Sequence, residues 1–172
     1  SMKLSRSLNP EHMLPSKLPP ATVELPTKVE LPPLDAGEAA RIAAGGLVFR
    51  PYRNDYGVNR GIAVQRVEAA SSEVWAALLD FEAYPRMVDD VCASTVYEQN
   101  GCDVKVAVKV GYGAVGLTTC LHHTYDASAG QLTWTLDENR PSSFKSNEGF
   151  WVVRALDEGT NACVVYYSIA VE

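Results

Sequence analysis

The sequence predicts an α+β fold: a helix-grip arrangement in which a curved antiparallel sheet of about six to seven strands carries two short helices after its first long strand. Two observations predict this fold. From residue 91 onward, apolar and polar side chains alternate with a period near two, and short turn sequences separate the runs. Before them, residues 71–85 have an amphipathic helical pattern. Consecutive strands with segregated helices indicate α+β rather than a parallel sheet.

Composition limits the function classes. The chain has 172 residues, of which 47% are hydrophobic and 21% charged, as in one globular domain with a tail. A net charge of −6 argues against nucleic acid and anionic membrane surfaces, because both need clustered Lys and Arg. No apolar run is long enough to predict a transmembrane segment, although transient membrane contact stays open.

The cysteines are scattered and form no CxxC pair. We interpret them as free thiols, which favours a reducing compartment such as the cytoplasm or an organelle interior. They are Cys92, Cys102, Cys120 and Cys163.

Proline divides the chain in two. Seven of the ten prolines lie within residues 1–33, which predicts an extended segment over residues 1–34 and a folded domain over 35–172. The near-repeat VELPTK–VELPPL at residues 23–34 has two interpretations. It is a disordered linker, or its apolar side chains lie on the domain and cover exposed surface; these are Val23, Leu25, Val29 and Leu31.

Helix signals stand at two places. Asp35 with Glu38 predicts a capping box for a short helix that ends at Gly45-Gly46. Ser71 or Ser72 is the expected N-cap of the next helix. Pro85 disfavours helix at Tyr84, so we expect two short helices with a kink between them.

The strands begin with GLVFRPYR and VNRGIAVQRVEA, which a turn separates. Asn100-Gly101 predicts a tight hairpin between CASTVYE and DVKVAVKV. Three glycines in the middle of the sheet sequence predict a bulge or a sharp bend there. They are Gly111, Gly113 and Gly116.

The alternation also predicts which side chains face inward. The inner face is apolar and carries a few hydroxyls, which suits a cavity for a hydrophobic molecule. Because a register error of one residue would turn a strand over, each assignment is separate. The candidates for lining the cavity are Trp75, Val104, Val106, Val108, Leu121, His123, Leu132, Trp134, Trp151, Val153, Val165 and Tyr167.

Catalytic and metal sites have weaker signals. His122 and His123 are neighbours on a strand and so point to opposite faces, which excludes a metal site formed by the pair. His123 could orient a ligand or donate a proton, or it could be a satisfied polar residue at the sheet rim. The sequence has no nucleophile elbow and no phosphate-binding glycine loop. We therefore expect no cofactor and assign no catalytic residue.

Several motifs together resemble a known family. A strand ending in VEA followed by SSEVWAALLDFEAYP is similar to the first strand and paired helices of the START-like (SRPBCC) helix-grip superfamily. QLTWTL, EGFWVV and the stretch from Cys163 to Ile169 are similar to its W-x-L, G-x-W and T-x-x-x-Y strand motifs. ARIAAGGLVFRPYR looks like the lead-in of its cyclase branch. The resemblance covers residues 36–172.

The superfamily includes birch-pollen-allergen relatives, polyketide cyclases and coenzyme Q-binding proteins. The resemblance therefore implies binding or transfer of a hydrophobic small molecule such as a lipid, sterol, quinone or polyketide. The alternatives are a polyketide cyclase or dehydratase and a START-like interaction module. A cyclase should bring His123, Tyr125 and a carboxylate together, whereas a carrier should have an almost wholly apolar cavity.

One departure from the family stands out. Its members usually close with a long C-terminal helix in the grip of the sheet, whereas this sequence ends in the strand-like YYSIAVE. The concave face would then be partly bare. We expect the VELP repeats, or a second copy in a dimer, to cover it.

Overall fold

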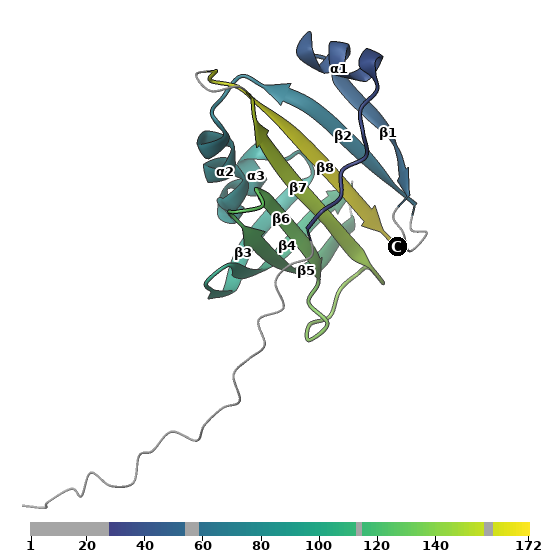
Figure 1. The fold of residues 1–172 in the computed structure, drawn as a ribbon. Helices are drawn as coiled ribbons and strands as arrows, with labels where there is room; N and C mark the ends of the chain where they lie inside the picture. The colour runs from purple at the N-terminus through teal and green to yellow at the C-terminus, as the bar shows by residue number, and fades with distance from the viewer. Residues whose placement is uncertain (1–27, 54–58, 113–114, 157–159) are drawn as a thin grey trace, which may run out of the picture.

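The computed structural model describes residues 28–53, 59–112, 115–156 and 160–172 (Figure 1). The helical elements are α1 (Ala36–Ala43), α2 (Ser71–Leu79), the 3-10 turn η2 (Phe81–Ala83) and α3 (Tyr84–Met87). The strands are β1 (Leu47–Arg53), β2 (Asn59–Val67), β3 (Val91–Asn100), β4 (Asp103–Tyr112), β5 (Val115–Asp126), β6 (Gln131–Leu136), β7 (Asn147–Ala155) and β8 (Cys163–Val171). No helix in the described part of the chain has both the length and the apolar character needed to cross a membrane.

The strands of the described residues form a single eight-stranded sheet in the order β1-β2-β8-β7-β6-β5-β4-β3. Every neighbouring pair is antiparallel. The α+β prediction is confirmed, and the sheet has slightly more strands than predicted. Because β2 pairs with the last strand β8, the N-terminal hairpin joins the later meander in one sheet.

Helix α1 begins as its sequence predicts. The Asp35 carboxylate accepts a hydrogen bond from the Glu38 backbone N–H at 2.8 Å, and the Glu38 carboxylate accepts from the Asp35 N–H at 3.0 Å. Two N–H groups that the first helical turn leaves unpaired are thereby satisfied. The capping box is confirmed.

The second helical region differs from the prediction in detail. The N-cap position is Ala70, not Ser71 or Ser72, and its N–H donates to the Glu73 carboxylate at 2.9 Å. The helix breaks at Asp80 rather than at Tyr84, whose backbone is helical. Pro85 lies in the first turn of α3, where its missing N–H costs no helical hydrogen bond.

The tight hairpin between β3 and β4 is present, one residue later than predicted. Asn100 pairs with Asp103, and Gly101 between them has φ 59°. Of the two features predicted at the glycines, the bulge is absent from the described residues, because β4 and β5 pair without a shift. The chain reverses direction there instead, with Gly111 opposite Gly116 in the β4–β5 hairpin. The register shifts occur in β3 instead, and Gly113 lies outside the described residues.

The sheet has two different faces. The face against α2, η2 and α3 is here called the inner face; its core cluster is Phe81, Val104, Val106, Val108, Leu121, Leu132 and Trp134. On the opposite, outer face a second buried cluster joins α1 to β1, β2 and β7; it consists of Ile42, Val48, Ile62, Val64, Phe150 and Val152.

Residues 28–34 cross the outer face (Figure 1). Val29 and Leu31 pack against the outer cluster, and the Val29 N–H donates to the Gln131 side chain at 2.9 Å. Val29 and Leu31 therefore lie on the domain and cover apolar surface, as one interpretation of the repeat predicts, but the expectation that they cover the concave face is wrong. Val23 and Leu25 lie outside the described residues.

Candidate functional site

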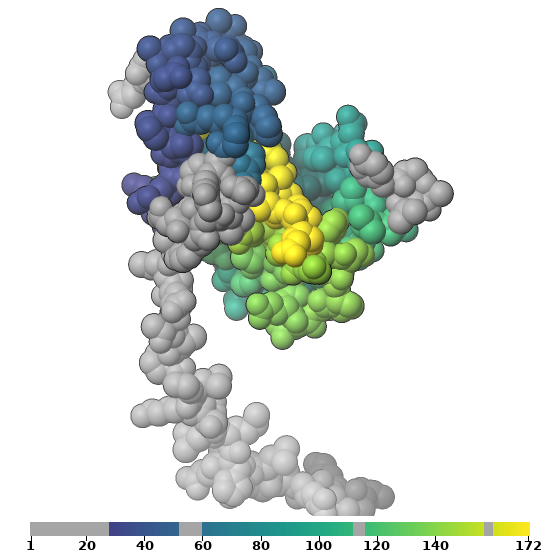
Figure 2. Space-filling view, turned by 90° about the vertical axis from the view of Figure 1, so that its right-hand side faces the viewer, coloured from purple at the N-terminus to yellow at the C-terminus, as the bar shows by residue number. Residues whose placement is uncertain are grey.

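A cleft of about 330 Å³ opens on the inner face and is here called the main cleft. Strands β3 to β8 contribute its floor, and η2 and α3 contribute one wall. Its lining side chains are mostly apolar or aromatic: Phe81, Tyr84, Val88, Asp89, Asp90, Val91, Val108, Val110, Thr119, Leu121, His123, Trp134, Asn147, Trp151, Tyr167 and Ile169. In Figure 2 the C-terminal strand lies in a recess of the molecular surface, between the N-terminal part of the sheet and the β4–β5 end.

The connection from α3 to β3 shapes the rim of this cleft. Asp90 has φ 67°, a left-handed conformation that Asp tolerates better than most residues. Its carbonyl accepts a hydrogen bond from the Gly111 N–H at 2.8 Å, which ties the rim to β4. Val88 beside it is 46% exposed although it is apolar. The rim therefore combines a fixed backbone with an exposed apolar side chain.

The cavity-lining candidates predicted from the sequence all lie on the inner side of the sheet or on α2. Six of them line the main cleft: Val108, Leu121, His123, Trp134, Trp151 and Tyr167. Val104 and Val165 line neighbouring hollows. The remaining candidates, Trp75, Val106, Leu132 and Val153, pack in the adjoining core clusters.

Sequence reasoning missed the rim and two polar groups. Asp89 and Asp90 are absent from the residues that the sequence predicts to line the cavity, yet both line the cleft. Thr119 and Ile169 continue the alternation of Leu121 and Tyr167, so the period of two could have found them. Asn147 follows an irregular turn, and its sequence context carries no such signal.

His123 lies deep in the main cleft and is only 5% exposed. Its ring centroid is 4.6 Å from that of Phe81 and 5.8 Å from that of Trp134. Burial lowers the pKa of His123 from 6.5 to about 3. A backbone hydrogen bond to Val104 raises this pKa in part, and the neighbouring His122 lowers it further. The imidazole is therefore neutral near neutral pH.

Other polar side chains of the cleft have partners in the protein. Asn147 accepts a hydrogen bond from the Trp134 indole N–H at 3.1 Å, and the Thr119 hydroxyl accepts from Ser142 at 3.3 Å. Tyr84 donates its hydroxyl to the Leu78 carbonyl at 2.7 Å. Burial, and next the neighbouring Tyr167, raise the pKa of Tyr84 above its ordinary value. These groups hold the walls of the cleft in place.

A second hollow of about 320 Å³ adjoins the main cleft on the inner face. It lies between α2 and the strands β1, β2 and β8. Trp151 and Tyr167 line both hollows. These two rings are therefore the shared wall between them.

Beyond the second hollow, one end of the inner face is bare. Leu47 is 53% exposed, Phe49 70% and Val171 48%. The Phe49 ring lies over Gly61, where a β-carbon would come within 2.6 Å of it. The concave face is thus partly uncovered among the described residues.

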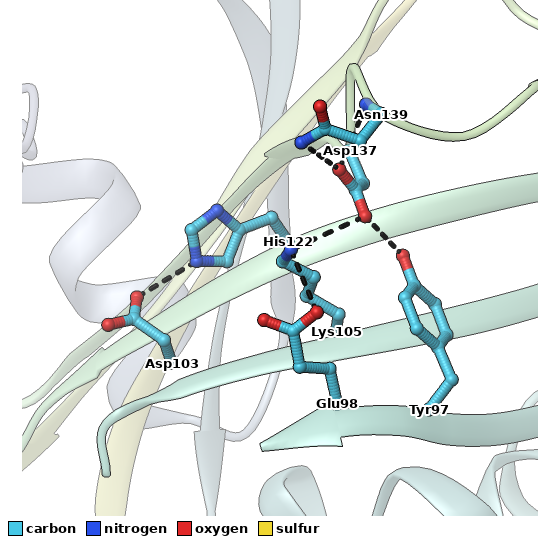
Figure 3. A network of polar contacts seen from close by, with 7 residues as sticks. All are labelled: Tyr97, Glu98, Asp103, Lys105, His122, Asp137 and Asn139. Atoms are coloured by element: carbon cyan, nitrogen blue, oxygen red, sulfur yellow. Dashed lines mark hydrogen bonds and ion pairs between the residues drawn. The ribbon is translucent and has the colours of Figure 1, made fainter. Parts of the chain in front are cut away.

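The outer side of β3 to β6 carries a polar network instead (Figure 3). Tyr97 donates to the Asp137 carboxylate at 2.8 Å, and Lys105 bridges Asp137 and Glu98. The hydrogen bond from Tyr97, then that from the Asn139 backbone, hold the pKa of Asp137 below its ordinary value. This network faces away from the main cleft.

The two adjacent histidines separate as strand geometry requires. His122 lies on the outer side, with its Nε2 2.9 Å from an Asp103 carboxylate oxygen (Figure 3). Tyr125, the other group of the cyclase expectation, lines a third hollow and contacts Trp75 with ring centroids 4.9 Å apart. It does not line the main cleft with His123.

Part of the sequence matches a known protein family. Residues 67–172 match the family described as polyketide cyclase/dehydrase and lipid transport, which is more than half of the chain. The chain belongs to this family. No curated protein sequence matches it. The START-like resemblance seen in the sequence is confirmed.

Solved structures show the same fold as this family member at low sequence identity. A STAR-related lipid transfer protein from Xanthomonas axonopodis has a TM-score of 0.59 at 17% identity, over 74% of this chain and 77% of that one. A START superfamily protein from Mycobacterium smegmatis has a TM-score of 0.57 at 16% identity, over 66% of this chain and 76% of that one. The Zhui aromatase/cyclase from Streptomyces sp. R1128 has a TM-score of 0.52 at 14% identity, over 73% of this chain and 69% of that one.

Proposed function

We propose that the protein binds a hydrophobic small molecule in the main cleft and carries or presents it without altering it. The observation that carries this proposal is the main cleft itself, about 330 Å³ in volume and lined mostly by apolar and aromatic side chains. Binding sites for small molecules usually span about 300–1,000 Å³ and have this apolar lining with a few polar groups. The family description and the fold of the lipid transfer protein agree with it.

The arrangement of polar groups favours binding over cyclisation. General acid–base chemistry needs a group whose pKa lies near the working pH and a partner within hydrogen-bond reach. His123 has a pKa of about 3, too low for an acid near neutral pH. Tyr125 faces a different hollow, and the carboxylates Asp89 and Asp90 stand on the cleft lining beside α3. A carrier requires none of these groups to react.

Filling the cleft tests the proposal. Leu121→Trp places a larger side chain in the cleft floor, and Thr118→Trp places the same ring on the exposed outer side of the same strand. Titration with N-phenyl-1-naphthylamine, an uncharged dye that becomes fluorescent in apolar sites, is the measurement. We expect Leu121→Trp to weaken dye binding at least tenfold and Thr118→Trp to leave it unchanged. Equal binding by both variants would contradict the proposed site.

Native mass spectrometry of protein from its own source gives the second test. A bound carrier ligand should appear as a discrete added mass that organic solvent extracts unchanged. Recovery of a chemically altered product after incubation with a polyketide-like substrate would instead favour an enzyme.

A further inference from the structure

Asn147 presents an unused hydrogen-bond donor to the main cleft. The residue begins β7, lines the cleft and is only 7% exposed. Its side-chain Nδ2 donates no hydrogen bond within the described part of the chain. It is nevertheless not one of the unpaired atoms that the protein covers completely, which belong to Arg60, Arg66, Ser94 and His123. Nδ2 therefore keeps accessible surface, and because Asn147 lines the cleft, a bound molecule can reach it.

The bond made by the other end of this amide fixes its orientation. The Trp134 indole N–H donates to Oδ1 of Asn147 at 3.1 Å. An indole N–H can only donate, so the amide oxygen has to face Trp134 and Nδ2 has to point away from it. Turning the amide over would set two donors against each other and lose a buried hydrogen bond.

Trp134 in turn is held by its neighbours on the sheet. It lies opposite Gly149 on β7, and a β-carbon at Gly149 would collide with the Trp134 ring. The centroid of that ring is 5.8 Å from the ring of His123 and 6.1 Å from the ring of Tyr167. The indole, and with it the amide of Asn147, therefore has a fixed position in the floor of the cleft.

The other polar groups of the cleft discriminate less. The carboxylates of Asp89 and Asp90 belong to exposed residues and only accept when ionised. The Tyr167 hydroxyl rotates, so it can donate or accept as the bound molecule requires. The Trp151 indole only donates, but its side chain is half-buried and also lines the second hollow. The oriented amide of Asn147 is thus the group best placed to distinguish an acceptor from a donor.

We infer that Asn147 sets the specificity of the main cleft: its Nδ2 donates a hydrogen bond to an acceptor atom of the bound molecule, and the fixed amide disfavours a molecule that offers only a donor there. This inference rests on the proposed function and adds the residue that selects and orients the ligand. A molecule that fills the cleft shields Nδ2 from water. Without an acceptor it leaves a buried donor unpaired, which costs free energy.

Two isosteric probes test it by isothermal titration calorimetry near neutral pH: 2-acetylnaphthalene, whose carbonyl accepts, and 2-isopropenylnaphthalene, whose CH₂ group in the same place does not. The measured quantity is the ratio of their affinities. Asn147→Asp keeps the oxygen that faces Trp134 and replaces Nδ2 by a second acceptor. We expect it to lower the ratio about fivefold to tenfold, the effect usual for one net hydrogen bond. Glu148→Gln, at the adjacent residue on the outer side, should keep the ratio.

The outcomes separate the two proposals. An unchanged ratio in Asn147→Asp, or an equal fall in Glu148→Gln, overturns the inference while the proposed function stands. A fall in Tyr167→Phe with none in Asn147→Asp assigns the contact to that hydroxyl and overturns it too. If the wild-type protein binds neither probe, the proposed function fails and the inference with it.

A second measurement needs no variant. In wild-type protein labelled with ¹⁵N and ¹³C, NMR should show a downfield shift of one side-chain amide proton of Asn147 on addition of 2-acetylnaphthalene. The shift with 2-isopropenylnaphthalene should be much smaller. Equal shifts with both probes would contradict a hydrogen bond from Nδ2, even if Asn147→Asp did not fold.

Discussion

Trp151 and Tyr167 lie directly opposite each other on β7 and β8, with ring centroids 4.2 Å apart and planes inclined by 36°. Both rings line the main cleft and the second hollow, so their contact decides whether the two spaces communicate. We expect this cross-strand pair to limit the size of a molecule that fits the main cleft.

Removing one ring should lengthen the ligand that fits. In Tyr167→Leu the two hollows should join, whereas Tyr167→Phe keeps the ring and should keep the limit. Displacement of a fluorescent dye by n-alkanols of increasing length is the measurement, because each buried CH₂ adds about 0.8 kcal/mol. We expect affinity to stop rising at a longer alkanol in Tyr167→Leu than in the wild type. The same limit in both would show that the rings do not divide the space.

His123 should make stability depend on pH. Its pKa falls from 6.5 in the unfolded chain to about 3 in the folded protein, mainly through burial. The unfolded state then binds more protons in this range, so the free energy of unfolding should decrease as pH falls from about 6.5 toward 3, by at most about 1.4 kcal/mol per unit. Urea unfolding across this range is the measurement. His123→Phe should lose this component and His122→Gln should retain it; identical slopes in wild type and His123→Phe would refute it.

The hydrogen bond from Tyr97 to Asp137 should contribute to stability. Tyr97→Phe removes one donor to a carboxylate whose residue is 5% exposed, so we expect the melting temperature to fall by several degrees. Lys145→Ala breaks an ion pair in which both side chains are more than two-thirds exposed and should have almost no effect. Because the pKa of Asp137 is lowered on folding, its contribution is present above its ordinary pKa and is lost as pH falls through the lowered value. Equal melting temperatures for both variants would contradict this ranking.

The segment before α1 should stabilise the domain through the outer face. Leu31→Ser removes an apolar contact with the outer cluster and should lower the free energy of unfolding by about 1–2 kcal/mol. Phe49→Ser, at a side chain 70% exposed, should change it by less than about 0.5 kcal/mol. Chemical denaturation measures both. Dye binding in the main cleft should survive Leu31→Ser, and its loss would place the segment on the wrong face.

The alternation of valines in β4 was enough to predict the inner face, because a strand with one dry side fixes its own register. The paired histidines separated for the same reason. The side that Val29 and Leu31 cover could not be predicted, since both faces of this half of the sheet are apolar. The cleft rim was also missed: Asp90 reaches it through a backbone conformation that side-chain patterns do not record.

The hydrogen bond between Val29 and Gln131 joins residues 102 positions apart. Gln131 is fully buried and lies on β6, which pairs with β5 and β7. Its side-chain oxygen should reach the position that accepts this hydrogen bond only when both neighbouring strands are in place. We therefore expect residues 28–34 to dock over Ile62, Val64 and Val152 only after β6 and β7 have joined the sheet. The slowest refolding phase should then report the docking of Val29 rather than the closure of the main cleft.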